Sequence, residues 1–186
     1  INPHFLYNAL DALYCMAIVH EEDKIATMVA ALSDNFKLSL NKGSNLIQVR
    51  DELDHIRAYI TIQNMRYKDK FHVQIQVDSS LMDKKILKLL LIPFVENAVY
   101  HGLETKIGEG NIWITGHEEE ERIVFTVIDD GVGIDDMSKL NKGYGINNVK
   151  ERIELYYGEN SEVVITSEPG KGTRVKIVLM ENEMRI

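Results

Sequence analysis

Apolar residues recur at helical spacing through the first part of the chain. They stand three or four positions apart in two runs, which are Phe5, Ala9, Leu13 and Met16, and then Ile25, Met28, Leu32 and Phe36. This is the period of an amphipathic helix, with an irregularity near residues 20–23, and Asn2-Pro3 is a favourable helix start. A second helical pattern covers residues 49–67. The two stretches predict a helical hairpin whose open apolar face packs against a second copy or against the neighbouring domain.

Beyond residue 70 the spacing changes to a mixture of strand and helix periods. Residues 71–77 alternate apolar and polar side chains, which is typical of a half-buried strand. Residues 81–100 have a helical pattern that Pro93 must kink or break, and a further helix over 145–157 ends at Gly158. Four more strands are predicted, the first two as a hairpin, at residues 111–117, 122–128, 163–166 and 173–179.

The order of these elements predicts an α+β fold, because the helices and strands do not alternate strictly. We expect an α/β sandwich, with helices on one face of a mixed sheet, over residues 70–186. The helical hairpin over residues 1–69 would precede it. A chain of 186 residues is long enough for one ordinary domain and such a smaller helical piece.

Composition and charge narrow the class of protein. Hydrophobic residues make up 45% of the chain and charged residues 27%, as in soluble globular proteins. A net charge of -8 argues against a nucleic-acid partner, and the single cysteine, Cys15, fits a reducing cytoplasm. No apolar run approaches the ~18 residues that a membrane helix needs. Because the chain begins at Ile1 inside a motif, we expect a fragment, whose parent could reach a membrane only through the upstream region.

The most informative feature of the chain is a series of four short motifs between Glu96 and Thr173, each weak alone, of which one is the sequence DDGVG at residues 129–133. Asp129 follows an apolar predicted strand, so its carboxylate would project from the strand end into a pocket. A carboxylate there can accept a hydrogen bond from an exocyclic amine, which distinguishes adenine from guanine. Gly131 and Gly133 would let the backbone approach a flat base closely. The alternative is an Asp-Gly turn that binds no ligand.

Asn97 and its neighbours lie on the predicted helix that would face the same pocket. The neutral amide oxygen of Asn97 suits Mg²⁺, which takes few protein ligands when phosphates supply the others. Glu96 could support the water ligands of the metal or act as a base. His101, one helical turn after Asn97, could contact phosphate or could simply end the helix at Gly102.

Two glycine motifs complete the predicted pocket. Gly143-Tyr144-Gly145 opens a helix, where glycines give a mobile lid and free N–H groups suit phosphate. Lys142 could add positive charge there or remain solvated. Gly172-Thr173 would close the pocket beside Asp129. Neither motif has the spacing of a Walker loop or of a dinucleotide fingerprint.

Together these motifs resemble a known family. Asn97 and the sequences DDGVG, GYG and GKGT are similar to the N, G1 and G2 boxes of the GHKL ATP-binding superfamily. The opening INPHFLYNAL resembles the phosphoacceptor box of LytS/YehU-type sensor histidine kinases, and PFVENAVYHGL and GYGINNVKERIELYYG resemble the same family. The resemblance covers essentially the whole chain.

The resemblance implies autophosphorylation, in which the γ-phosphate of ATP passes to an imidazole and then to an aspartate of a separate response regulator. By this resemblance His4 is the phosphoacceptor, Asn97 the Mg²⁺ ligand and Asp129 the residue that reads adenine. Neutral imidazole is a competent nucleophile near pH 7. The residues that shape the pocket would be Gly131, Gly133, Gly143, Gly145, Gly172 and Thr173. The family also implies a homodimer, a regulator of the LytTR type, and a cytoplasmic domain of an integral membrane sensor.

Two positions depart from the family pattern. Many histidine kinases carry an acidic residue directly after the phosphoacceptor, where this chain has Phe5, so the base stays open with Glu96 as the candidate. Superfamily members that hydrolyse ATP often have a glutamate one helical turn before the metal-binding asparagine, where this chain has Pro93. A kinase is therefore favoured over an ATPase. The alternatives are a non-catalytic ATP-sensing dimerisation module of the same fold, and a protein serine kinase, which would not need the His4 hairpin.

Overall fold

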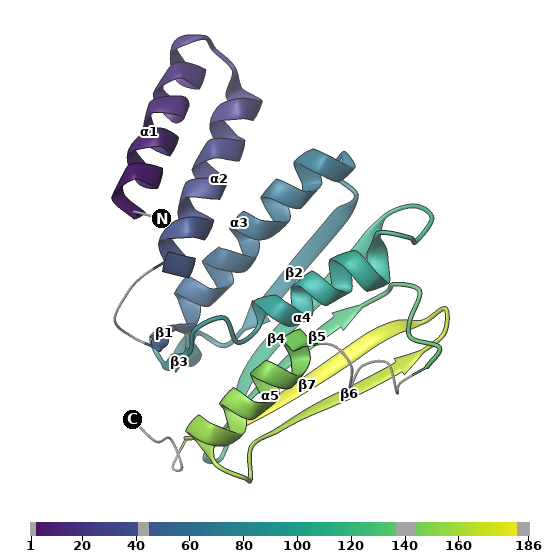
Figure 1. Cartoon of the computed structure of the whole chain (residues 1–186). Helices are drawn as coiled ribbons and strands as arrows, with labels where there is room; N and C mark the ends of the chain where they lie inside the picture. The colour runs from purple at the N-terminus through teal and green to yellow at the C-terminus, as the bar shows by residue number, and fades with distance from the viewer. Residues whose placement is uncertain (1–2, 41–44, 137–143, 182–186) are drawn as a thin grey trace.

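The described residues of the helical part form three helices, where the sequence predicted two. The computed structural model describes residues 3–40, 45–136 and 144–181, and it begins with α1 (Pro3–Val19) and α2 (Asp23–Leu40), followed by α3 (Val49–Tyr67). Figure 1 shows α1 and α2 side by side, joined by a short turn. Glu21 lies in the left-handed region with a φ of 58°, so the predicted irregularity is a reversal of the chain.

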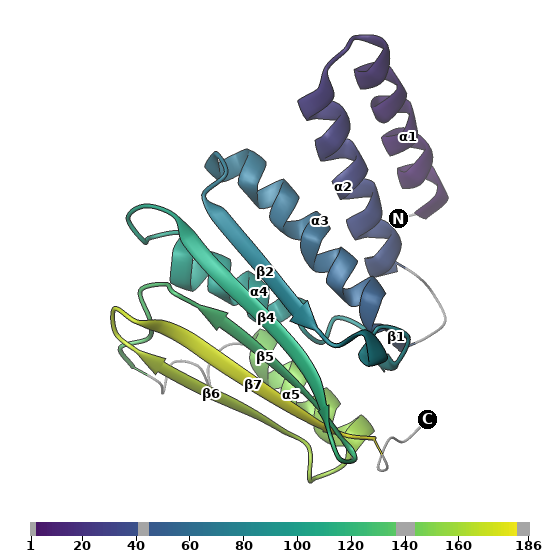
Figure 2. The same ribbon diagram turned by 180° about the vertical axis from the view of Figure 1, so that it is seen from behind.

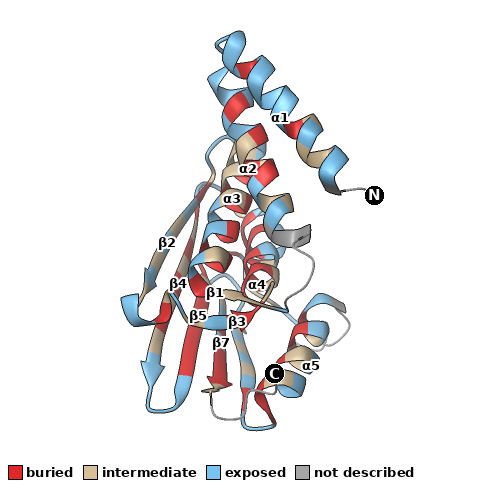
Figure 3. Cartoon of the chain, turned by 90° about the vertical axis from the view of Figure 1, so that its left-hand side faces the viewer, coloured by how far each residue is buried: buried red, intermediate tan, exposed pale blue. Residues whose placement is uncertain are grey.

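The third helix shares its core with the sheet. Val49, Leu53 and Ile56 of α3 are fully buried among side chains of the strands and of α4 (Ile92–Asn97). The apolar face of α3 is therefore covered by the neighbouring part of the chain. In Figure 3, α1 is mainly exposed, whereas α3 and the central strands carry most of the buried residues.

The sheet is mixed, as predicted, and its strands follow the order β2-β4-β5-β7-β6. Strand β2 (Phe71–Val77) runs parallel to β4 (Gly110–Glu119), and the other neighbours are antiparallel. The remaining strands are β5 (Arg122–Asp129), β6 (Glu162–Glu168) and β7 (Gly172–Met180). Figures 1 and 2 show α3, α4 and α5 (Tyr144–Tyr157) on one face of this sheet and, among the described residues, no helix on the other. The predicted α+β architecture is confirmed.

The prediction of one helix over residues 81–100 is wrong in its first half. A short turn, η1 (Ser79–Leu81), leads into β3 (Lys85–Leu87), which pairs antiparallel with β1 (Leu46–Gln48). Helix α4 begins only at Ile92, with Pro93 in its first turn, where the missing N–H has no helical partner to lose. It continues as a π-helical turn, η2 (Ala98–Leu103). Over the described residues, no helix is both long and apolar enough to cross a membrane.

Candidate functional site

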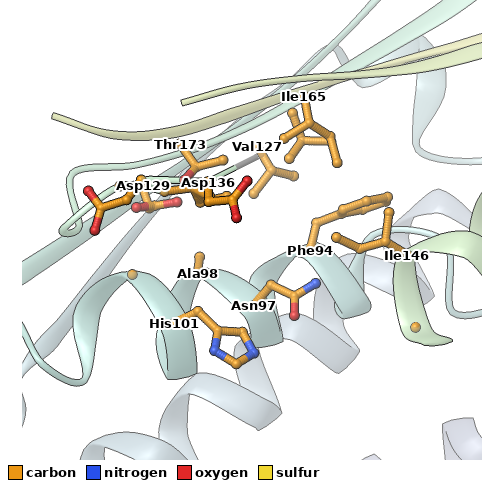
Figure 4. Close-up of a pocket in the computed structure, with 16 residues that line it drawn as sticks. Phe94, Asn97, Ala98, His101, Val127, Asp129, Asp136, Ile146, Ile165 and Thr173 are labelled. Carbon is orange, nitrogen blue, oxygen red and sulfur yellow. The ribbon is translucent and has the colours of Figure 1, made fainter. Parts of the chain in front are cut away.

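A cavity of about 380 Å³ lies between α4, the start of α5 and the sheet. Figure 4 shows Val127 and Ile165 of the strands facing Phe94 and Ile146 of the helices. The polar side chains of Asp129, Asp136 and Thr173 gather at one end of the cavity. Apolar walls with a few polar groups at one end suit a flat heteroaromatic ring.

The two neighbouring aspartates, Asp129 and Asp130, make different contacts. Asp130 is committed to the protein, because its carboxylate accepts hydrogen bonds from the backbone N–H and side-chain amide of Asn111, each at 2.8 Å, and pairs with Lys106 at 2.8 Å. Asp129 lies at the cavity with only 5% of its surface exposed, and its Oδ1 accepts the N–H of Gly131 at 2.8 Å. The N–H of Thr173 is a second donor to this carboxylate, which can still accept a bond from a ligand because each of its oxygens carries two lone pairs.

The environments of the two carboxyl groups shift their pKa values in opposite directions. Burial raises the pKa of Asp129 to about 6, against the opposing effect of N–H groups from Gly131 and Thr173. For Asp130, burial alone would raise the pKa, but the hydrogen bonds from Asn111 and the charge of Lys106 outweigh it and lower the pKa. Asp129 is thus the member of the pair with the raised pKa, and strongly shifted pKa values are common among functional carboxyl groups.

Asp129→Asn is expected to stabilise the fold at neutral pH and Asp130→Asn to destabilise it. Because the folded pKa of Asp129 lies above its ordinary value of 3.8, its contribution is complete below about pH 4 and is lost as the pH rises through 6. The asparagine removes that loss, worth about 3 kcal/mol at pH 7.5 and about 1 kcal/mol at pH 4.5. Asp130→Asn breaks a charged network and should cost about 1–3 kcal/mol at pH 7.5. Thermal denaturation of both variants at the two pH values measures this, and equal shifts for both would contradict it.

The glycines around Asp129 mainly allow protein segments to touch. A Cβ atom on Gly131 would lie 2.4 Å from the backbone of Gly102, and a Cβ on Gly102 would lie 2.7 Å from Oδ1 of Asp129. Gly131 does not line the cavity, whereas Gly133 does. Gly102 and Gly131 therefore let η2 approach the turn after β5, and admitting a flat base stays a prediction for Gly133, which lines the cavity.

Ser167 holds two segments of the site together by hydrogen bonds, a role that was not predicted from the sequence. Its hydroxyl accepts the N–H of Ile134 at 2.9 Å, donates to the carbonyl of Gly172 at 2.8 Å and lies 3.0 Å from the hydroxyl of Thr173. It thus ties the turn after Asp129 to the predicted closing turn, of which Thr173 lines the cavity. A serine in an alternating strand gives no sequence signal for such a role.

Asn97 and His101 lie one helical turn apart and both line the cavity. Figure 4 shows their side chains projecting from the helix next to one another, with Ala98 directed at the strands. Gly145, at the start of α5, lines the opposite side. The predicted Lys142 and Gly143 fall outside the described residues. The structure thus brings together Asn97, His101, Asp129, Gly133, Gly145 and Thr173. Gly172 does not line the cavity but packs closely against the backbone of Asp129.

Comparisons with known proteins agree with this arrangement. Residues 1–71 match the family model described as histidine kinase. Residues 82–183, which are more than half of the chain, match the model described as histidine kinase-, DNA gyrase B-, and HSP90-like ATPase. The chain belongs to this ATPase family.

Curated proteins similar to this chain include sensor proteins. The chain is 33% identical over 182 residues to the sensor histidine kinase YesM of Bacillus subtilis, a match to 96% of this chain and 32% of the relative. It is 30% identical over 193 residues to the sensor protein LytS of Oceanobacillus iheyensis, covering 96% and 33%. The chain thus spans about a third of the length of the curated relatives it matches. The predicted resemblance to LytS-type sensor histidine kinases is confirmed.

A solved histidine kinase structure shares the fold. It is the histidine kinase domain of a blue-light activated histidine kinase from Erythrobacter litoralis, with a TM-score of 0.56 over 98% of this chain and 87% of that one. At 19% identity this likeness concerns the fold alone.

Two residues predicted to act in this ATPase-family chain lie away from the cavity. Glu96 borders a different hollow between α2, α3 and α4, together with Pro93 and His55. His4 is exposed on α1, where the side-chain amide nitrogen of Asn8 lies 3.3 Å from its Nδ1. In Figure 1, α1 is separated from α4 and α5 by α2 and α3. The structure therefore does not bring His4 and Glu96 to the cavity.

Proposed function

We propose that this chain is the catalytic core of a two-component sensor histidine kinase that binds Mg-ATP and phosphorylates its own His4. The observation that carries the proposal is the buried Asp129 at the end of an apolar cavity, in a chain that also presents an exposed histidine on a separate helix. The match of residues 1–71 to a histidine kinase model supports the same reading.

The cavity suits adenine because its walls are apolar and its buried polar group is an acceptor. The exocyclic amine of adenine would donate to a remaining lone pair of the Asp129 carboxylate, while the carbonyl oxygen of guanine would be repelled by that carboxylate. Phe94, Ile146 and Ile165 would cover the faces of the ring.

Asp129→Asn is expected to lower the affinity for ATP by about tenfold, since a hydrogen bond to a charged acceptor is worth ~1.5–3 kcal/mol. The same variant should be more stable than the wild type near pH 7.5, so unfolding would not explain a loss of affinity for ATP. Calorimetric titration with ATP and GTP measures the effect. An unchanged ATP affinity, or a wild-type protein that prefers GTP, would refute the role of Asp129.

The described lining residues indicate how the phosphates would be held. Among them the only basic side chain is His101, whereas Asp135 and Asp136 add negative charge. A triphosphate there needs a cation, and Mg²⁺ accepts one neutral oxygen ligand from Asn97 when phosphates and water complete its shell. The described residues hold no cluster of three or more His, Cys, Asp or Glu that could bind a metal, which fits a site built mainly by the nucleotide.

In the transfer step a ring nitrogen of His4 attacks the γ-phosphorus of ATP, and the bond to the β-γ bridging oxygen breaks, releasing ADP. The imidazole loses one proton, for which Glu96 was the sequence candidate; its distance from the cavity gives that candidate no support. The phosphoryl group would then pass to an aspartate carboxylate of a response regulator, which we propose to be of the LytTR type.

A homodimer would supply the movement or the partner surface that transfer requires. Helices α1 and α2 expose apolar side chains that a single chain leaves uncovered, among them Phe5, Leu13, Met16, Ile18 and Met28. Burying such a surface stabilises association. We further propose that the chain is the cytoplasmic part of a membrane-bound sensor.

Labelling with γ-³²P ATP and Mg²⁺ tests the function. We expect label on the protein that is stable in alkali and lost in acid, as for a phosphoramidate, and that moves to a receiver domain with an acceptor aspartate. Nucleotide binding without label in the dimeric protein would support a non-catalytic ATP-sensing module instead. Acid-stable label on a hydroxyl residue would support a serine kinase.

A further inference from the structure

The helix that carries Asn97 begins without a capping side chain of its own. The residue before α4 is Leu91, whose side chain cannot accept a hydrogen bond, and no local side chain caps the helix. The first N–H groups of a helix have no partner within it, so they need an acceptor from elsewhere.

Glu52 of α3 supplies that acceptor from about forty positions earlier in the chain. Its Oε2 accepts the N–H of Leu89 at 3.0 Å, and its Oε1 accepts those of Leu91 and Ile92 at 2.8 and 3.3 Å. The side chain is fully buried. Leu89 itself lies in the left-handed region with a φ of 57°, so Glu52 also holds a backbone conformation that a leucine rarely adopts.

The same short segment is held from α5. The hydroxyl of Tyr157 accepts the N–H of Leu87 at 3.0 Å, and a guanidinium nitrogen of Arg152 donates to the carbonyl of Lys88 at 2.5 Å. Residues 87–92 therefore join α3, α4 and α5. Of these, α4 carries Asn97 and α5 begins at the opposite wall of the cavity.

We propose that Glu52 is a positioning residue for the magnesium–nucleotide site, because it fixes the start of the helix on which Asn97 lies five residues later. Through Glu52, the position of α3 sets the position of the metal ligand. The inference rests on the proposed function, since it takes Asn97 to be the ligand of Mg²⁺. Asp129 stands on the sheet and does not depend on this contact, so recognition of the base would remain.

The test compares Glu52→Gln with Asp54→Asn in the whole protein. Glu52→Gln keeps the length of the side chain but replaces one accepting oxygen with an NH₂ group, which cannot accept the N–H it would face. Asp54→Asn removes the same charge from the exposed face of the same helix. The affinity for ATP is measured with Mg²⁺ and with EDTA, and amide hydrogen exchange is followed over residues 87–97.

We expect Glu52→Gln to lower the affinity for ATP by about tenfold with Mg²⁺, to leave it within about twofold in EDTA, and to speed exchange at residues 89–92. Adding Asn97→Ala should weaken binding no further, because both changes remove the same interaction. Asp54→Asn should behave as the wild type. If Glu52→Gln does not fold, Glu52→Asp, which keeps the charge but is one carbon shorter, should show the same magnesium-specific loss at smaller size.

Equal losses with Mg²⁺ and with EDTA, or additive losses with Asn97→Ala, would show that Glu52 only stabilises the fold and would overturn the inference. Wild-type affinity in Glu52→Gln would do the same and leave the proposed kinase untouched. The kinase proposal alone would be overturned if Glu52→Gln showed the magnesium-dependent loss of affinity while the wild-type protein carried no label on His4. Binding that does not depend on Mg²⁺ in the wild type would overturn both.

Discussion

Phosphoryl labelling is expected to fall at least about 100-fold in His4→Gln, while the affinity for Mg-ATP stays within about twofold. Glutamine has no nucleophilic ring nitrogen, and His4 lies on α1, away from the cavity that would bind the nucleotide. Loss of the acceptor should therefore remove the chemistry without touching binding. Both quantities are measured on the same preparation, by autoradiography after incubation with labelled ATP and by nucleotide titration.

His20→Gln is the matched control for this prediction. His20 is also exposed and lies in the turn after α1, so its replacement should leave labelling at the wild-type level. Label that persists in His4→Gln would identify another acceptor and refute the assignment. Mixing His4→Gln with Asp129→Asn subunits then tests the route, since label above that of Asp129→Asn alone, at an ATP concentration too low to saturate that variant, requires transfer from one subunit to the other.

Gly172→Ala is expected to destabilise the protein by at least about 4 kcal/mol, or to prevent folding. Gly172 has a φ of 90°, and a Cβ atom there would lie 2.0 Å from the carbonyl oxygen of Asp129. The clash is with the backbone of the neighbouring strand, so no side-chain rotation relieves it. Thermal and urea denaturation monitored by circular dichroism measure the loss.

Two other glycines separate the causes of this effect. Gly170 also has a positive φ, of 78°, but open space around its Cβ position, so Gly170→Ala should cost only about 1 kcal/mol. Gly145 has open space and a place in the first turn of α5, so Gly145→Ala should be neutral or slightly stabilising. A Gly172→Ala protein as stable as Gly170→Ala would refute the steric argument.

The strands and the architecture followed closely from the sequence, because alternation and turn residues are local signals. The predicted strand over residues 71–77 and the predicted hairpin over 111–128 are present, as is the helix that ends before Gly158. The helix over 81–100 failed in its first half. There Ile86 and Leu87 are buried in a two-stranded pairing with residues 46–48, a contact that no local period reveals.

The candidate site was predicted in part. Six of its residues meet at one cavity, as the motifs indicated, while Glu96 faces a different hollow and His4 lies on a separate helix. The spacing of a motif places residues along one element. It does not say which side of that element faces a ligand, and Glu96 and Asn97 are adjacent positions on α4, about 100° apart around the helix axis, that border different cavities.

The sequence by itself determined which residue types stand at the strand and helix ends where a nucleotide site can form. It determined the mixed sheet as well, because period and turn chemistry depend on residues close together in the chain. Only the tertiary structure decided that Asp129, and not Asp130, faces the cavity, since Asn111 and Lys106 occupy Asp130. Only the tertiary structure showed Glu52 at the start of α4, because burial and the pairing of backbone N–H groups join residues that the sequence keeps far apart.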